Sequence, residues 1–106
     1  MPKYLIKASY TAEGAKGLLK DGGSKRREIA EQAMKSAGGK MEAFYFAFGD
    51  TDVFLIVDAP DHASVSAASL AINASGAVRT ETVVLITPEE IDQAAKKSVT
   101  YRAPGH

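Results

Sequence analysis

Two aspartates near the middle of the chain have the type and spacing that catalytic chemistry often uses. Asp50 and Asp52 stand two residues apart, so their carboxylates share a face wherever the backbone is extended. Two like charges on one face raise the pKa of one carboxyl, as a general base requires, and a divalent cation can instead bridge them. Aspartate is also common in tight turns, where it accepts hydrogen bonds from local backbone donors. Asp52 is the candidate catalytic base, because it also begins an apolar run.

A second group of polar side chains falls on the first and last predicted strands, which are neighbours in the expected sheet. Arg79 and Glu81 share a face by the period of two, and Lys7 lies on the neighbouring strand. A cation there would hold a carboxylate-bearing ligand, although such charges also form cross-strand ion pairs. Tyr10 and Tyr45 could line the same cavity and offer hydroxyl groups. These five residues are the candidate ligand-binding set.

The sequence carries no signature of a bound metal or cofactor. It contains no cysteine, and its two histidines, His62 and His106, lack metal-ligand spacing. Phosphate-binding glycine loops and dinucleotide fingerprints are missing as well, so we expect no cofactor. The basic run 24–27 opens a predicted helix and is expected to be an exposed face rather than a phosphate site.

Charge and hydropathy narrow the range of partners. The 106 residues include 13 basic and 13 acidic ones, so no net field attracts nucleic acid or anionic lipid. No apolar run approaches the roughly 20 residues that a membrane helix needs, and the N-terminus lacks the apolar core of a signal peptide. We therefore expect a cytoplasmic protein that binds neither nucleic acid nor membranes.

Four strands and four helices are predicted to position the candidate residues. The alternation of apolar and polar residues predicts strands at 4–10, 40–48, 52–59 and 78–86. Capping residues and apolar stripes predict helices at 11–19, 24–37, 61–76 and 88–97, with N-caps at Thr11, Ser24, Asp61 and Thr87. This order defines an α+β, ferredoxin-like βαββαβ fold: a four-stranded antiparallel sheet, helices on one face, and an extra C-terminal helix. We expect a single domain over 1–97 and a tail over 98–106.

The second and third strands form a hairpin that is apolar on both faces. One face of the second strand is predicted to carry Phe44, Phe46 and Phe48, and the other Met41, Ala43, Tyr45 and Ala47. Helices cover only one face of such a sheet, whereas a face left in water should be polar. We therefore predict a homo-oligomer in which sheets pack face to face. The alternative is that the last helix or the tail folds back over the open face.

The hairpin and its flanks resemble the GYD domain family over about residues 2–92. The resemblance rests on the Phe-Tyr run that ends at Gly49 and is followed by Asp52, on the sequence 59–61, and on the sequence 76–82. The family's signature turn reads glycine, any residue, tyrosine, aspartate, and Thr51 replaces the tyrosine here. The resemblance implies a ferredoxin-like fold of the dimeric α/β-barrel type, and a tendency to oligomerise, in a family whose function is largely unassigned.

Three functional hypotheses follow. The leading one is a homo-oligomeric small-ligand binding or regulatory protein, whose cavity between sheet and helices is rimmed by Tyr10, Asp52 and Arg79. The second is a cofactor-independent enzyme of the monooxygenase or isomerase type, with Asp52 as base and Arg79 holding an oxyanion. A tautomerase variant of this hypothesis uses Pro2, exposed by removal of Met1, as a secondary amine. The third is a structural module that only assembles, which predicts no cavity.

Overall fold

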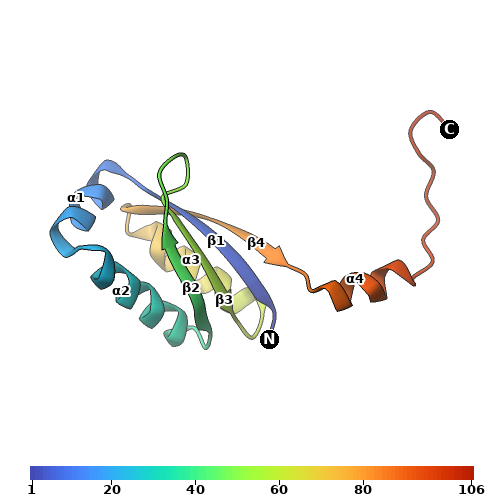
Figure 1. Cartoon of the computed structure of the whole chain (residues 1–106), viewed down its shortest axis with the longest axis horizontal. Coiled ribbons are helices and arrows are strands. Elements are labelled where there is room, and N and C mark those ends of the chain that lie inside the picture. Colours follow the sequence, from blue (N-terminus) through green and yellow to red (C-terminus); the bar gives the residue numbers. More distant parts are fainter.

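The computed structural model describes residues 1–106 and places eight elements in the predicted order (Figure 1). The strands are β1 (Lys3–Tyr10), β2 (Lys40–Phe46), β3 (Val53–Asp58) and β4 (Val78–Leu85). The helices are α1 (Ala12–Asp21), α2 (Gly23–Ser36), α3 (His62–Ala74) and α4 (Pro88–Ala95). All strands pair antiparallel in the order β2-β3-β1-β4. The α+β ferredoxin-like prediction is confirmed.

Side-chain caps fix three of the four helix starts, as predicted. Thr11 accepts a hydrogen bond from the Gly14 amide, and Asp61 accepts one from the Ser64 amide. Thr87 forms a capping box at the start of α4. The predicted cap at Ser24 is wrong, because α2 already begins at Gly23. Gly22, with φ of 85°, ends α1 and opens α2, in a conformation that side-chain-bearing residues avoid.

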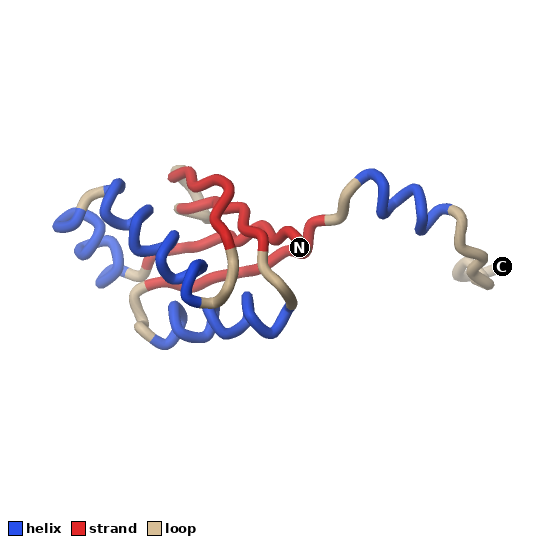
Figure 2. Tube along the Cα trace, turned by 90° about the horizontal axis from the view of Figure 1, so that it is seen from below, coloured by secondary structure: helices blue, strands red, loops and turns tan.

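The hydrophobic core lies between one face of the sheet and the helices α2 and α3 (Figure 2). Alternate residues of β1 and β3 point into it and pair across the strands, as Ile6 does with Leu55. Met34 of α2 and Val65 of α3 close the core from the helical side. The other face of the sheet is left without a covering layer.

The β2–β3 hairpin differs from its prediction in two ways. A register shift between Met41 and Ala43 places Met41 opposite Val57, so Met41 packs against the core and not on the open face. The strand ends at Phe46, and residues 47–52 form a six-residue loop, whereas the predicted strands at 40–48 and 52–59 leave room only for a tight turn. Phe48 therefore lies in the loop, fully exposed.

The C-terminal segment extends away from the body. Every residue from Ile86 to His106 is exposed, and α4 projects beyond the end of β4 (Figure 1). The alternative that the last helix or the tail covers the open sheet face is therefore wrong for this chain. No helix is both long and apolar enough to cross a membrane.

Candidate functional site

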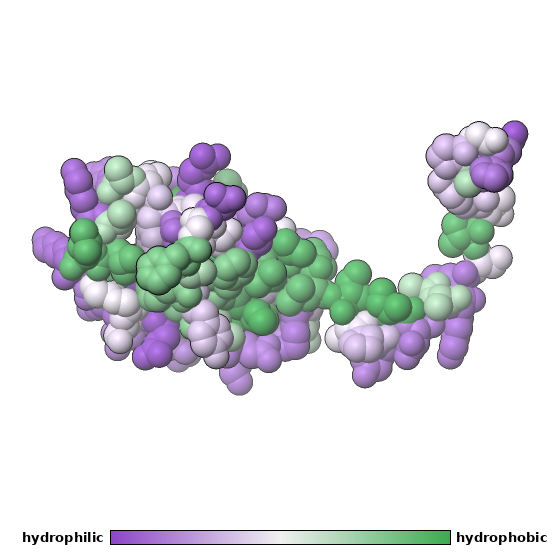
Figure 3. All heavy atoms as spheres, turned by 45° about the horizontal axis from the view of Figure 1, so that its top comes forward, coloured by the Kyte–Doolittle hydropathy of each residue, from purple (hydrophilic) through white to green (hydrophobic).

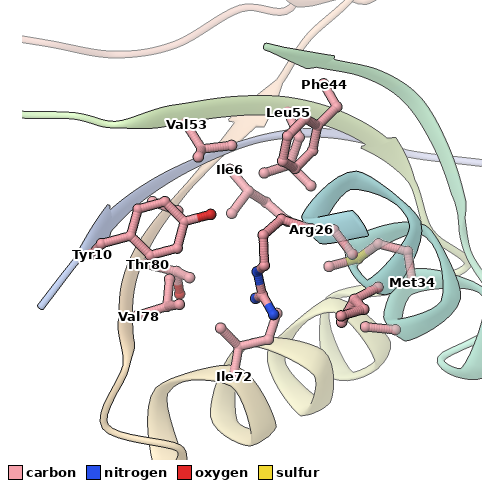
Figure 4. Close-up of a pocket in the computed structure, with 14 residues that line it drawn as sticks. Ile6, Tyr10, Arg26, Met34, Phe44, Val53, Leu55, Ile72, Val78 and Thr80 are labelled. Carbon is pink, nitrogen blue, oxygen red and sulfur yellow. The ribbon is translucent and has the colours of Figure 1, made fainter. Parts of the chain in front are cut away.

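A cavity of about 70 Å³ lies inside the core, between the sheet and the helices α2 and α3 (Figure 4). Of its 14 lining residues, 12 are hydrophobic. Ile6 and Leu55 form the part of its wall that belongs to the sheet, and Ile72 comes from α3. Because protein interiors are close-packed, a void inside the core of so small a domain calls for an explanation.

One charged side chain, Arg26, enters this apolar cavity. Arg26 lies one helical turn before Ile29 and Ala30, on the stripe of α2 that faces the sheet, so its side chain points inward (Figure 4). Both ion pairs of the protein are made by Lys3, which leaves the Arg26 guanidinium without a carboxylate partner. No fully buried polar side-chain atom lacks a hydrogen bond, so the guanidinium nitrogens remain reachable from outside. The expectation that run 24–27 is only an exposed face is wrong for Arg26.

The hydroxyl of Tyr10 points into the same space as the Arg26 guanidinium (Figure 4). Tyr10 ends β1, and its ring also lines an open groove of about 600 Å³ on the outer side. Leu18 of α1 and Phe46 of β2 form other parts of that groove. Tyr10 therefore separates a narrow inner cavity from a wide outer one.

Asp52 lies beside Tyr10, but its carboxylate is engaged by the backbone. Its Oδ2 accepts a hydrogen bond from the Tyr10 amide at 2.8 Å. The Asp52 amide donates to the Ala8 carbonyl at 2.9 Å, and its carbonyl accepts from the Ala47 amide at 2.8 Å. The first two bonds fasten the β2–β3 loop to the end of β1, and the third closes the loop on itself. No cluster of three acidic, histidine or cysteine side chains is placed to hold a metal ion.

The sheet separates the remaining predicted residues from the cavity. Ser9 pairs with Arg79 and Lys7 with Glu81, on the face opposite Tyr10. Because Tyr10 pairs with the buried Val78, Arg79 lies on the open face and not at the predicted rim with Tyr10 and Asp52.

Tyr45 also lies on the open face, which separates it from Tyr10. It pairs with Phe54 of β3 and is 72% exposed. The two tyrosines therefore do not line one cavity, as the sequence suggested.

The open face also carries the charge cluster of the protein. Lys3 Nζ lies 2.9 Å from Asp58 Oδ1 and 2.7 Å from Glu42 Oε2. The hydrogen bond to Asp58, followed by the one to Glu42, raises the pKa of Lys3 above its ordinary value. Near it, Leu5 pairs with both Ile56 and Val83, which forms an apolar strip across three strands.

The fold and the matching sequence place this protein in a defined class. The GYD domain profile matches residues 4–95, so the chain belongs to the GYD domain family. The fold is also that of the crystal structure of MtbAldR, with a TM-score of 0.61 and 19% sequence identity. That match covers 97% of this chain and 57% of the MtbAldR chain, so this protein spans little more than half of the solved structure.

A relative from Thermus thermophilus is 29% identical over 86 residues. The match covers 81% of this chain and 90% of the relative, which is named "Glutamine synthetase and cystathionine beta-lyase binding protein".

Proposed function

We propose that this GYD protein is a cytoplasmic homo-oligomer that binds a small molecule in the cavity beneath its sheet. The observation that carries the proposal is the cavity itself, because a small domain has little core to spare and an unfilled apolar void costs stability. The void lies where β1, β3, α2 and α3 meet, so a ligand there would contact most of the fold. A regulatory protein needs such a connection between ligand and scaffold.

The open sheet face supports self-association. Its apolar strip of Leu5, Ile56 and Val83 is flanked by charges of both signs, such as Lys3 and Glu81. A face that carries both signs can be complementary to a second copy of itself across a two-fold axis. Apolar surface runs along the sheet and on toward α4 (Figure 3). We propose that a second copy covers this face, which would complete the dimeric α/β-barrel arrangement.

Native mass spectrometry of gently purified protein tests both parts of the proposal. We expect an oligomer that carries a retained small molecule. Ala33→Leu, which adds volume to the α2 wall of the cavity, should abolish retention without unfolding the protein. Ala63→Leu, on an exposed position of α3, is the matched control and should retain the molecule. An empty wild-type protein, or retention in the Ala33→Leu variant, would contradict the cavity as the ligand site.

The Thermus relative supports a second candidate, a protein-binding function. Exposed apolar side chains, including Leu19 and Phe48, surround the outer groove and could contact an enzyme surface. Glutamine synthetase and cystathionine beta-lyase, purified from the organism that supplies this chain, would be titrated against the immobilised protein. Saturable binding that Phe48→Ser removes and Tyr101→Ser leaves intact would support this candidate. The absence of binding to either enzyme would reject it.

The enzyme hypothesis has weaker support than either candidate. It requires a free Asp52 carboxylate and a nearby Arg79, whereas Asp52 Oδ2 is bonded to the Tyr10 amide and Arg79 lies on the other face of the sheet. A substrate in the inner cavity would meet Arg26 and Tyr10 instead.

A further inference from the structure

We infer that the ligand of the inner cavity is a small aliphatic monocarboxylate, bound through its carboxylate to Arg26 and the Tyr10 hydroxyl. This inference rests on the proposed small-ligand function and adds the chemical class of the ligand. It starts from the unpaired guanidinium in an apolar wall.

The position of Arg26 favours an anionic group. The guanidinium has no ion-pair partner and stays reachable from outside, so an anion that enters the cavity can bind it, and the apolar lining strengthens that attraction by excluding water. The planar guanidinium presents parallel N–H donors that match the two oxygens of a carboxylate. The Tyr10 hydroxyl points into the same space and can donate a third hydrogen bond to the same oxygens (Figure 4).

The remaining lining determines what else the ligand contains. Twelve of the 14 lining residues are hydrophobic, and the Thr80 hydroxyl already accepts a hydrogen bond from Asn73 Nδ2 at 2.7 Å. The lining contains no aspartate or glutamate, so an ammonium group would enter without a counter-charge. A free amino acid is therefore disfavoured relative to the acid of the same carbon skeleton that lacks the amino group.

The volume of the cavity limits the length of the apolar part. An apolar cavity of about 150 Å³ accepts benzene, and this one is about 70 Å³. An apolar part of about two or three carbon atoms fits this scale, whereas a longer tail would have to pass Tyr10 into the outer groove. The probe of choice is propanoate, with propanamide and alanine as matched compounds.

Isothermal titration and amide chemical shifts of the full-length protein test the inference. We expect propanoate to bind saturably, with shifts at α2 and at the end of β1. Propanamide and alanine should each bind at least tenfold more weakly. Arg26→Met, which keeps an unbranched apolar stem and removes the guanidinium, should weaken acid binding at least tenfold. Arg27→Met, at the exposed neighbouring position, should leave it unchanged.

A second variant tests the same binding site without changing position 26, in case the Arg26 substitution unfolds the protein. Tyr10→Phe keeps the ring and should weaken acid binding about threefold to tenfold, and thermal unfolding of each variant verifies that it is folded. Equal binding of acid and amide, or unchanged binding in Arg26→Met, would overturn the inferred ligand class but leave the small-ligand function standing. If neither compound binds, the inferred class is wrong, and ligand retention in the Ala33→Leu experiment decides the function separately.

Discussion

At the scale of single residues, Asp52 joins the hairpin loop to the first strand. Its Oδ2 accepts from the Tyr10 amide, and its own amide donates to Ala8. Tyr10 sits at the entrance of the cavity, so the same bond that holds the loop also fixes the backbone from which the Tyr10 ring projects. The carboxylate thereby positions a binding residue.

Substitutions of Asp52 separate this positioning role from a catalytic one. Asp52→Ala leaves the Tyr10 amide without its acceptor and should lower the free energy of unfolding by about 1–2 kcal/mol. Asp52→Asn keeps an acceptor oxygen and should lose much less. Urea unfolding of both variants measures the difference. A chemical activity that Asp52→Asn abolishes in a fully folded protein would instead restore the role of general base.

Asp61 gives a pH dependence with a defined sign. Hydrogen bonds from Ser64 at the start of α3 lower the pKa of Asp61 below its ordinary value of 3.8. A group with a lowered folded-state pKa stabilises the protein above its unfolded pKa, and this contribution is lost as the pH falls through the folded value. The stability advantage of wild type over Asp61→Ala should thus be constant near neutral pH and shrink below about pH 3.8. Urea unfolding between pH 2.5 and pH 7, chosen as roughly bracketing these values, tests it.

The acid-unfolding test has a non-titrating control. Asp61→Asn also caps helices but carries no charge, so its stability relative to Asp61→Ala should not change across the same pH range. A wild-type advantage that persists undiminished at the lowest pH would contradict a role for the Asp61 charge.

Arg26 shows what sequence reasoning could and could not reach at this scale. The stripe of Ile29, Ala30 and Ala33 was visible, and extending it by one turn toward the N-terminus would have placed Arg26 on the inward face. Its basic neighbours Lys25 and Arg27 suggested a solvated run instead. The lack of an ion-pair partner depends on groups far away in the chain, and no local pattern reveals that.

At the scale of elements, features that depend on a few consecutive residues could be predicted from the sequence, whereas features that depend on how strands pair could not. The caps at Thr11, Asp61 and Thr87 were predictable because each depends on three or four consecutive residues. The β2 register shift depends on how β2 meets β3, so alternation within β2 alone placed Met41 on the wrong face. Arg79 is a second example. Whether it lies near Tyr10 depends on which residues of β1 and β4 share a face of the sheet, and the pattern within either strand alone does not determine that.

Gly14 allows α1 to pack closely against Ala77, the residue directly before β4. A Cβ added at Gly14 would lie 2.0 Å from the Ala77 carbonyl oxygen, which is a backbone atom with little freedom to move. Gly14→Ala should therefore destabilise the protein by about 1–3 kcal/mol, as overpacking a core does. Gly17→Ala in the same helix meets open space and should be neutral or stabilise it by up to about 1 kcal/mol. Thermal unfolding compares the two, and equal midpoints would contradict close packing at Gly14.

At the scale of the whole molecule, the open sheet face and the cavity lie on opposite sides of a single sheet. Leu5 and Ile6 are adjacent in β1, and their side chains point to these two sides. A second copy packed on the open face would press on the strands that also form the cavity wall. Assembly and ligand binding are therefore expected to influence each other through β1 and β3.

Neighbouring positions of β4 test the assembly. Val83 lies on the open face opposite Leu5, whereas Val84 lies on the other face opposite Tyr4. Val83→Glu places a charge in the proposed interface and should shift the protein to monomers in sedimentation velocity. Val84→Glu introduces the same charge in the same strand and should leave the oligomer intact. A monomeric wild-type protein, or an unaffected Val83→Glu oligomer, would reject sheet-face assembly.

The projecting α4 has a consequence for how fast its backbone exchanges with solvent. Eight residues with a capping box form too short a helix to be stable on their own, and none of them is buried against the body. Their amides should exchange with deuterium through local fraying, without waiting for the sheet to open, while the β1 amides exchange only on global unfolding. If the second copy also covers α4, raising the protein concentration would slow deuterium exchange at Ile91 and leave exchange in β1 unchanged. The exchange rate of α4 would then measure how much of the protein has assembled.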